Sequence, residues 1–166
     1  MDAGLLVIRV VLGALMAAHG SQKLFGWFGG YGLTGTGGFF EALGFRPGRL
    51  FAALAGFAET FGGLLFAVGF LAPWASMAII SVMLVAIGSV HWGNGLFAMS
   101  NGVEVPLLYA AAAAGVALTG PGAYSLDAIF ALASFWTPVV GLFAIAAGVA
   151  GAGANLLLRR PVPQPA

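Results

Sequence analysis

The sequence predicts an all-α membrane protein: a four-helix transmembrane bundle followed by a fifth, C-terminal transmembrane helix. Of the 166 residues, 61% are hydrophobic and 7% are charged, and the mean hydropathy is +1.03. A soluble domain carries about 25% charged residues, so this chain has too little charge to cover a water-facing surface. In addition, apolar runs near the ~20 residues that cross a bilayer alternate with segments rich in glycine, proline and aromatic residues.

Composition also excludes several functions. The chain has no cysteine, which rules out disulfides, cysteine-ligated zinc, iron–sulfur clusters and thiol catalysis by its own residues. A net charge of +1 gives no support for a nucleic-acid partner. The N-terminus lacks a basic region and Arg9 interrupts the first apolar run, so we expect that run to remain as a membrane span and not to be cleaved as a signal peptide.

The first predicted span covers residues 4–24, with Arg9 in its first half. This arginine either snorkels to the membrane interface or is a buried counter-charge for an acid elsewhere. Residues 25–49 then form a long connection rich in glycine and aromatic residues, which suits the headgroup boundary. Within it, residues 37–44 are expected to form a short amphipathic helix on the membrane surface, ended by Gly44.

The second predicted span covers residues 50–71 and contains Glu59. Ala52, Gly56, Glu59 and Gly63 share one helical stripe, and small residues on a stripe permit close helix contact, so Glu59 is expected to face protein. A carboxylate inside a membrane marks a functional site by default, although many such acids only anchor a structural salt bridge.

A short turn leads to the third span at residues 74–90, which ends at His91, and Glu104 and Pro106 mark the start of a fourth span at residues 105–119. The next helix is expected to be capped by Ser125 or Asp127.

A fifth apolar segment covers residues 128–158. The break at Thr137-Pro138 leaves the part from 138 to 158 long enough to span the bilayer alone. We therefore divide the chain into a four-helix bundle (1–127), an additional C-terminal membrane helix (128–158) and a disordered, basic, proline-rich tail (159–166).

Alternation of the spans brings the polar residues together. The end of span one, the start of span two, the end of span three and the start of span four all lie at one face of the membrane. The residues predicted to gather there are His19, Gln22, Lys23, Glu59, His91, Trp92, Asn94 and Glu104. Three interpretations remain open: a pocket for a small molecule such as a quinone, a structural ion pair such as Lys23 with Glu59, or a metal site, which the absence of Glu-x-x-His spacing disfavours.

These residues together resemble the DoxX family of small bacterial membrane proteins. The resemblance rests on Arg9, on His19-Gly20-Ser21-Gln22-Lys23-Leu24-Phe25 and the glycine-rich loop, on Glu59-Thr60-Phe61-Gly62-Gly63, on His91, and on the segment from Gly120 to Asp127. It covers about residues 4–127 and implies a four-helix membrane core, in which Arg9, Ser125 and Asp127 are structural polar residues. Some members of the family are linked to sulfur or redox metabolism, or to oxidative-stress defence. The fifth segment departs from the family pattern and suggests docking to a larger complex.

The resulting functional expectation is an accessory or quinone-interacting subunit of a redox system in a bacterial cytoplasmic membrane. We expect no covalently bound cofactor and no resident metal, with a quinone as the candidate ligand and other membrane subunits or a second copy as protein partners. The alternatives are a structural or assembly subunit without its own chemistry and a small solute transporter. An N-out, C-in orientation places Lys23, Arg46, Arg49, Arg159 and Arg160 on the cytoplasmic side, as the positive-inside rule favours.

Overall fold

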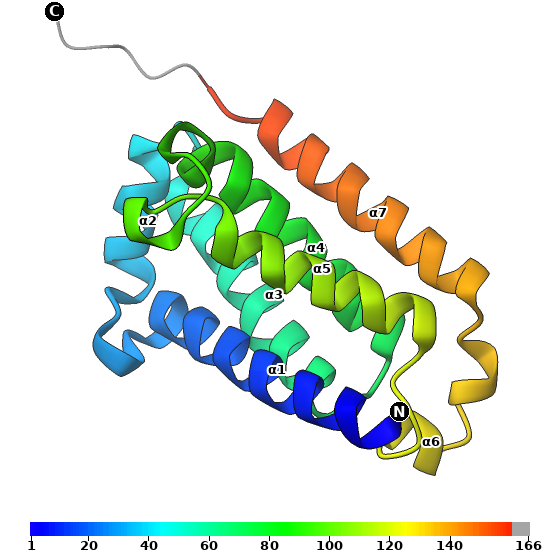
Figure 1. The fold of residues 1–166 in the computed structure, drawn as a ribbon. Helices are drawn as coiled ribbons and strands as arrows, with labels where there is room; N and C mark the ends of the chain where they lie inside the picture. Colours follow the sequence, from blue (N-terminus) through cyan, green and yellow to red (C-terminus); the bar gives the residue numbers. More distant parts are fainter. Residues whose placement is uncertain (161–166) are drawn as a thin grey trace, which may run out of the picture.

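The protein is a bundle of long helices, and no strand occurs among residues 1–160, which the computed structural model describes (Figure 1). Residues 161–166, which belong to the tail expected to be disordered, lie outside the described part. The helices in chain order are α1 (Asp2–Phe25), α2 (Gly32–Ala42), α3 (Gly48–Val68), α4 (Ala72–Ala86), α5 (Glu104–Thr119), α6 (Leu126–Ile129) and α7 (Pro138–Leu157).

Four of the helical segments are long and apolar enough to cross a membrane: α1, α3, α7 and the stretch Ala72–Asn94, which is α4 with its C-terminal extension. Helix α5 has 16 residues and is also apolar, but at roughly 24 Å it is shorter than the hydrocarbon thickness. The chain is therefore a multi-pass integral membrane protein. Both the predicted helical fold class and the fifth C-terminal helix are confirmed.

Helices α1 and α3 form the tightest pair, and glycine is the cause. A Cβ added to Gly13 would lie 2.5 Å from the Gly63 carbonyl oxygen, and one added to Gly20 would lie 2.4 Å from the Thr60 backbone nitrogen. The stripe predicted on the second span does face α1, with Ala52, Gly56, Glu59 and Gly63 all buried. Close contact along this stripe holds Glu59 inside the protein.

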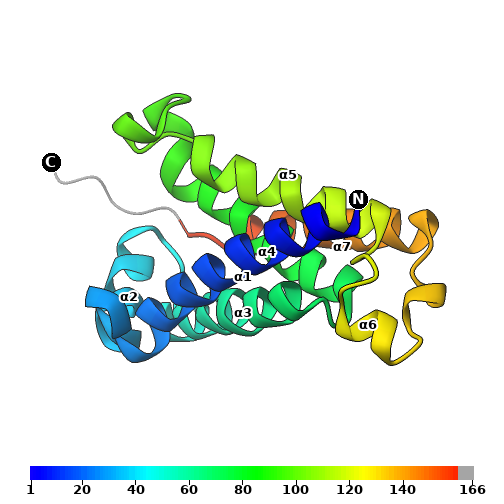
Figure 2. The same cartoon turned by 60° about the horizontal axis from the view of Figure 1, so that its bottom comes forward.

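Helix α4 lies at the centre and packs against α3, α5 and α7 (Figures 1 and 2). Its buried side includes Ile79 and Ile80, which join Phe66 of α3 and Val116 of α5 in one apolar core. Helix α7 packs on α4 and α5, on the far side of the bundle from α1 (Figure 1). The additional C-terminal helix is thus part of the bundle and not a detached anchor.

The connection between α1 and α3 differs from expectation. Helix α2 begins at Gly32, five residues before the predicted start at Gly37, and ends at Ala42. Its buried residues, Thr36 and Gly37, pack against α3, and a Cβ on Gly37 would come within 2.8 Å of the Arg49 side chain. Tertiary packing thus sustains a helix through glycines that disfavour it locally. Gly44 follows with a φ of +94°, which supports its predicted place after the helix end.

A second buried polar cluster occupies the end of the bundle opposite to the predicted pocket. Arg9 is fully buried and donates to the Tyr124 carbonyl oxygen at 2.5 Å, so the snorkelling alternative is wrong. Asp127, also fully buried, lies at the same end of the bundle and accepts hydrogen bonds from the Leu71 and Ala72 N–H groups. Ser125 caps α6 as predicted, by accepting a hydrogen bond from the Ala128 N–H. Buried polar residues therefore lie at both ends of the bundle, whereas the sequence pattern placed them clearly at one.

Candidate functional site

The centre of the site is an ion pair between Lys23 and Glu59. Lys23 lies in the last turn of α1, and Glu59 projects from the buried stripe of α3. The Glu59 side chain is 4% exposed and that of Lys23 is 26% exposed, so the carboxylate is inside the protein and the ammonium partly reaches its surface. Within residues 1–160 this is the only ion pair. The pairing considered from the sequence is present.

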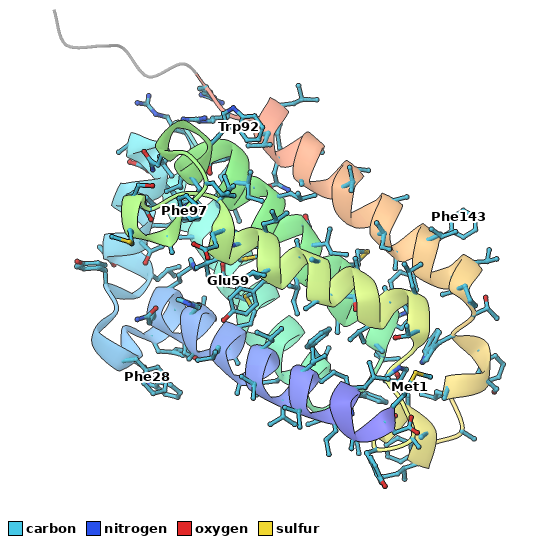
Figure 3. The ribbon with its side chains drawn as sticks, viewed as in Figure 1. Met1, Phe28, Glu59, Trp92, Phe97 and Phe143 are labelled. Atoms are coloured by element: carbon cyan, nitrogen blue, oxygen red, sulfur yellow. The ribbon has the colours of Figure 1, made fainter. Side chains whose placement is uncertain are left out.

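An inner cavity of about 300 Å³ adjoins the ion pair, between α1, α3, α4 and α5. Figure 3 shows Glu59 in the interior of the bundle, between α1 and α5. The polar residues that line the cavity are His19, Lys23, Glu59, His91, Asn101 and Tyr109. Met16 and Met83 supply much of its apolar wall. The cavity therefore combines ionisable groups with a largely apolar surface, as small-molecule sites do.

His91 lines this cavity from a turn in which the helix changes its winding. After α4 ends at Ala86, the chain continues as a π-helical turn from Ile87 to His91. Turns of this kind are rare and often occur at functional sites. The His91 Nδ1 atom lies 2.7 Å from the Asn101 carbonyl oxygen, to which it can donate. In the neutral tautomer that this contact favours, Nε2 is left as an acceptor.

The loop before α5 lies against the inner cavity. Residues 95–103 fold back on themselves, with the Val103 N–H donating to the Gly95 carbonyl oxygen at 3.0 Å. A Cβ on Gly102 would lie 2.4 Å from that same oxygen, so the close approach requires glycine. Asn101 and Gly102 line the cavity. The loop therefore forms part of the cavity wall as well as joining two helices.

An outer cavity of about 550 Å³ lies beside the inner one. It is lined by the end of α1 and by α2, including Gln22, Tyr31, Thr36 and Phe39. His19 and Lys23 line both cavities and so stand between them. The two spaces therefore lie next to each other, and both are adjacent to the ion pair through Lys23.

Three residues predicted to join the pocket line neither cavity. Trp92 is 76% exposed. Asn94 donates to the Val90 carbonyl oxygen at 3.0 Å, which braces the end of the third span. The Glu104 carboxylate accepts a hydrogen bond from the Ala98 N–H at 2.7 Å and so holds the loop before α5. The topology of the bundle places all three residues near the site. The side chains of Asn94 and Glu104, however, form hydrogen bonds with nearby backbone groups and do not line the cavities.

Other cavity residues were missed in the sequence. Tyr109 stands one and a half turns into α5 and is 7% exposed. Its position as the main polar side chain of an otherwise apolar helix was a usable signal. Asn101 carried no such signal, because its role depends on a backbone carbonyl placed by the loop.

The side chains that line the cavity have the chemistry to bind a ligand and to exchange protons. Imidazole, ammonium and phenol groups can donate hydrogen bonds to a carbonyl oxygen, and a carboxylate can exchange protons. No group of three or more His, Cys, Asp or Glu side chains converges for a metal within the described part of the chain.

Comparison with known proteins agrees with this architecture. The family model described as DoxX matches residues 4–92, which run from the start of α1 through the π-helical turn to Trp92. The match therefore includes His19, Lys23, Glu59 and His91, and it stops before α5 and α7. No curated protein and no solved structure matches the chain. Because the family model covers more than half of the sequence, the chain belongs to the DoxX family.

Proposed function

We propose that this protein binds a quinone headgroup in the inner cavity, as an accessory subunit of a membrane redox system in a bacterial cytoplasmic membrane. The observation that carries the proposal is the Lys23–Glu59 ion pair, with its buried carboxylate, at the wall of a largely apolar cavity of about 300 Å³. That volume lies at the lower end of the range for small-molecule sites, which suits a single substituted ring.

Hydrogen bonds would orient the ring. His19 and Lys23 can donate to one quinone carbonyl oxygen from the α1 side of the cavity. On the opposite side, His91 presents an acceptor nitrogen when its Nδ1 donates to Asn101, and this would favour the hydroxyl of the reduced form. The apolar wall, which includes Met16 and Met83, would enclose the ring faces.

Reduction of a quinone to a quinol takes up electrons and an equal number of protons. Glu59 is the group best placed to exchange a proton with bound quinone, and Lys23 stabilises its charge. Glu104, which the sequence placed in the same predicted pocket, accepts a hydrogen bond from the Ala98 N–H and is not included. Since the chain has no cysteine to hold a cluster, the electrons would come from a partner subunit with a flavin or metal centre.

The test is to purify the tagged full-length protein in a mild detergent and to quantify the extracted quinones by mass spectrometry. We expect near-stoichiometric quinone with the wild type and a loss of at least tenfold with Glu59→Gln. Glu104→Gln is the matched control, because it removes a carboxylate outside the cavity and keeps an oxygen acceptor for Ala98. The proposal fails if the wild type carries no quinone, or if both variants retain it equally.

A structural or assembly subunit is the second candidate. The observation that favours it is α7, which lies beyond the family match, packs on α4 and α5, and exposes an apolar face that includes Leu142 and Phe143 (Figure 3). In that case the protein would co-purify with partner subunits while its cavity holds no quinone. The same purification therefore separates the two candidates.

A further inference from the structure

An apolar groove on another side of the bundle has no part in the proposed quinone site. Helices α3 and α7 both pack on α4 but hardly touch each other, and a groove of about 350 Å³ runs between them. Small residues from all three helices line it, including Ala58, Ala78 and Gly151. Phe40, Phe45 and Phe51 close its upper end, where α2 joins α3.

Arginines stand at this upper end. Arg46 follows the groove residue Phe45 directly, and Arg159 lies one helical turn after the groove residue Asn155. The Arg159 Nε atom donates to the Leu43 carbonyl oxygen at 2.5 Å, which fastens the end of α7 to the α2–α3 connection. The exposed arginines of this end are Arg46, Arg49, Arg159 and Arg160.

These charges lack acidic partners. None of the four arginines forms an ion pair with another residue in the range 1–160. Glu41 is the only acidic residue between the start of α2 and the end of α3 apart from Glu59, and its carboxylate accepts a hydrogen bond from the Gly48 N–H at 3.1 Å. Glu59 is paired with Lys23. The four arginines therefore form a positively charged rim, called the arginine rim below, at one end of the apolar groove. The Glu41 carboxylate is the one acidic group nearby that offsets their charge.

We propose that an anionic phospholipid binds here, with its phosphate among the arginines and one acyl chain in the groove. Arginine forms paired hydrogen bonds with phosphate oxygens, and basic pockets between membrane helices are known to hold acidic lipid headgroups. From Asn155 to Ala147 the groove follows α7 for roughly 12 Å, so an acyl chain could extend from the rim toward the bilayer centre.

The chemistry of the groove and of its rim favours a lipid as the occupant. The exposed arginines at the upper end complement an anionic headgroup, and none of them is neutralised by an ion pair within residues 1–160. A single hydrocarbon chain is narrow enough to enter, and the groove's lining is almost wholly apolar, with Ser81 and Asn155 as its polar residues.

The test is native mass spectrometry of the delipidated full-length protein, titrated separately with phosphatidylglycerol and phosphatidylcholine that carry the same acyl chains. We expect phosphatidylglycerol to bind at least tenfold more tightly, and this preference to shrink as ionic strength rises. With Arg46→Gln/Arg159→Gln the preference should fall to within about twofold, whereas Arg46→Lys/Arg159→Lys should keep most of it. The salt dependence of the wild type needs no variant and stands even if a variant fails to fold.

The groove is tested by a matched pair of substitutions on α7. Ala147 and Ala146 are neighbouring exposed alanines, but only Ala147 lines the groove. Ala147→Phe should weaken the binding of both lipids at least fivefold, and Ala146→Phe should leave it unchanged. Equal affinity for the two headgroups, a preference insensitive to salt, or the same result for both phenylalanine variants would overturn the proposal. A dimer that Ala147→Phe alone disrupts would assign the groove to a second copy instead.

Discussion

At the level of single residues, the Lys23–Glu59 ion pair supports a prediction about the stability of the protein that does not depend on any ligand. Glu59 is 3% exposed, so Lys23→Met would leave a carboxylate buried without its counter-charge. Breaking a buried pair in this way costs roughly 3–5 kcal/mol. We expect a clearly lowered midpoint when thermal unfolding in detergent is followed by tryptophan fluorescence.

The double variant Lys23→Met/Glu59→Met is the control, because it removes both charges and keeps the volume. Replacing a whole buried pair by apolar side chains is often neutral or stabilising. Its midpoint should therefore return close to that of the wild type. A double variant as unstable as Lys23→Met would show that the buried charge is not the cause.

Asp127 supports a second prediction, at the other end of the bundle. Its carboxylate oxygens accept hydrogen bonds from the Leu71 N–H at 2.8 Å and the Ala72 N–H at 3.0 Å, and so cap α4 from a distant part of the chain. Asp127→Ala would leave these donors unsatisfied and remove the negative charge near Arg9, at a cost of roughly 3 kcal/mol or more.

The comparison for Asp127 is Asp127→Asn, which keeps one oxygen acceptor and should be less damaging than Asp127→Ala in the same unfolding measurement. Asp2→Asn, at the same end of the bundle, should change little, because the Asp2 carboxylate is partly exposed and its contact with the Ala123 N–H can pass to the amide oxygen. Equal losses for Asp127→Ala and Asp2→Asn would contradict the capping role.

At the level of elements, the α1–α3 interface depends on backbone contact at glycine. Gly13→Ala would place a Cβ 2.5 Å from the Gly63 carbonyl oxygen, and backbone atoms cannot move aside cheaply. Overpacking of this kind typically costs roughly 1–3 kcal/mol. Gly115→Ala in α5 is the matched control, since a Cβ there meets nothing within 4 Å. It should be neutral or stabilising by up to ~1 kcal/mol, and equal destabilisation by the two would exclude the packing explanation.

The same interface shows what the sequence could predict. The stripe that carries Gly56, Glu59 and Gly63 follows from helical periodicity alone, and so does its burial. The length of α2 does not, because its glycines disfavour a helix locally and only packing against α3 compensates. The sequence does not predict the π-helical turn that ends at His91 either, since nothing in Ile87-Gly88-Ser89-Val90 marks a change of helical winding.

For the candidate site, topology brought the correct helix ends together, and the structure surrounds one cavity with His19, Lys23, Glu59 and His91. Topology could not decide which side chains turn inward. Glu104 and Asn94 are held by backbone groups a few residues away, whereas Tyr109 lines the cavity from the first half of its short helix. Contacts of this kind depend on loop geometry, which periodicity does not encode.

At the scale of the whole molecule, positive charge is concentrated at one end. The Arg160 N–H donates to the Gly44 carbonyl oxygen at 2.9 Å, which places the end of α7 beside the start of α3. Lys23 at the end of α1 lies on this side too, while Arg9 lies buried in the opposite half. If the positive-inside rule applies, the arginine-rich end faces the cytoplasm and the N-terminus lies outside.

The absence of cysteine from the sequence allows a direct test of this orientation, because one introduced cysteine would be the only thiol. Tyr124→Cys is suited to the Arg9 end, where Tyr124 is 61% exposed, and Met99→Cys to the opposite end, where Met99 is 102% exposed. In intact bacterial spheroplasts, a membrane-impermeant maleimide should label Tyr124→Cys at once and Met99→Cys only after the membrane is opened. The reverse pattern would place the arginine rim and the mouth of the inner cavity outside the cell, and a proton exchanged at Glu59 would then be drawn from the external side.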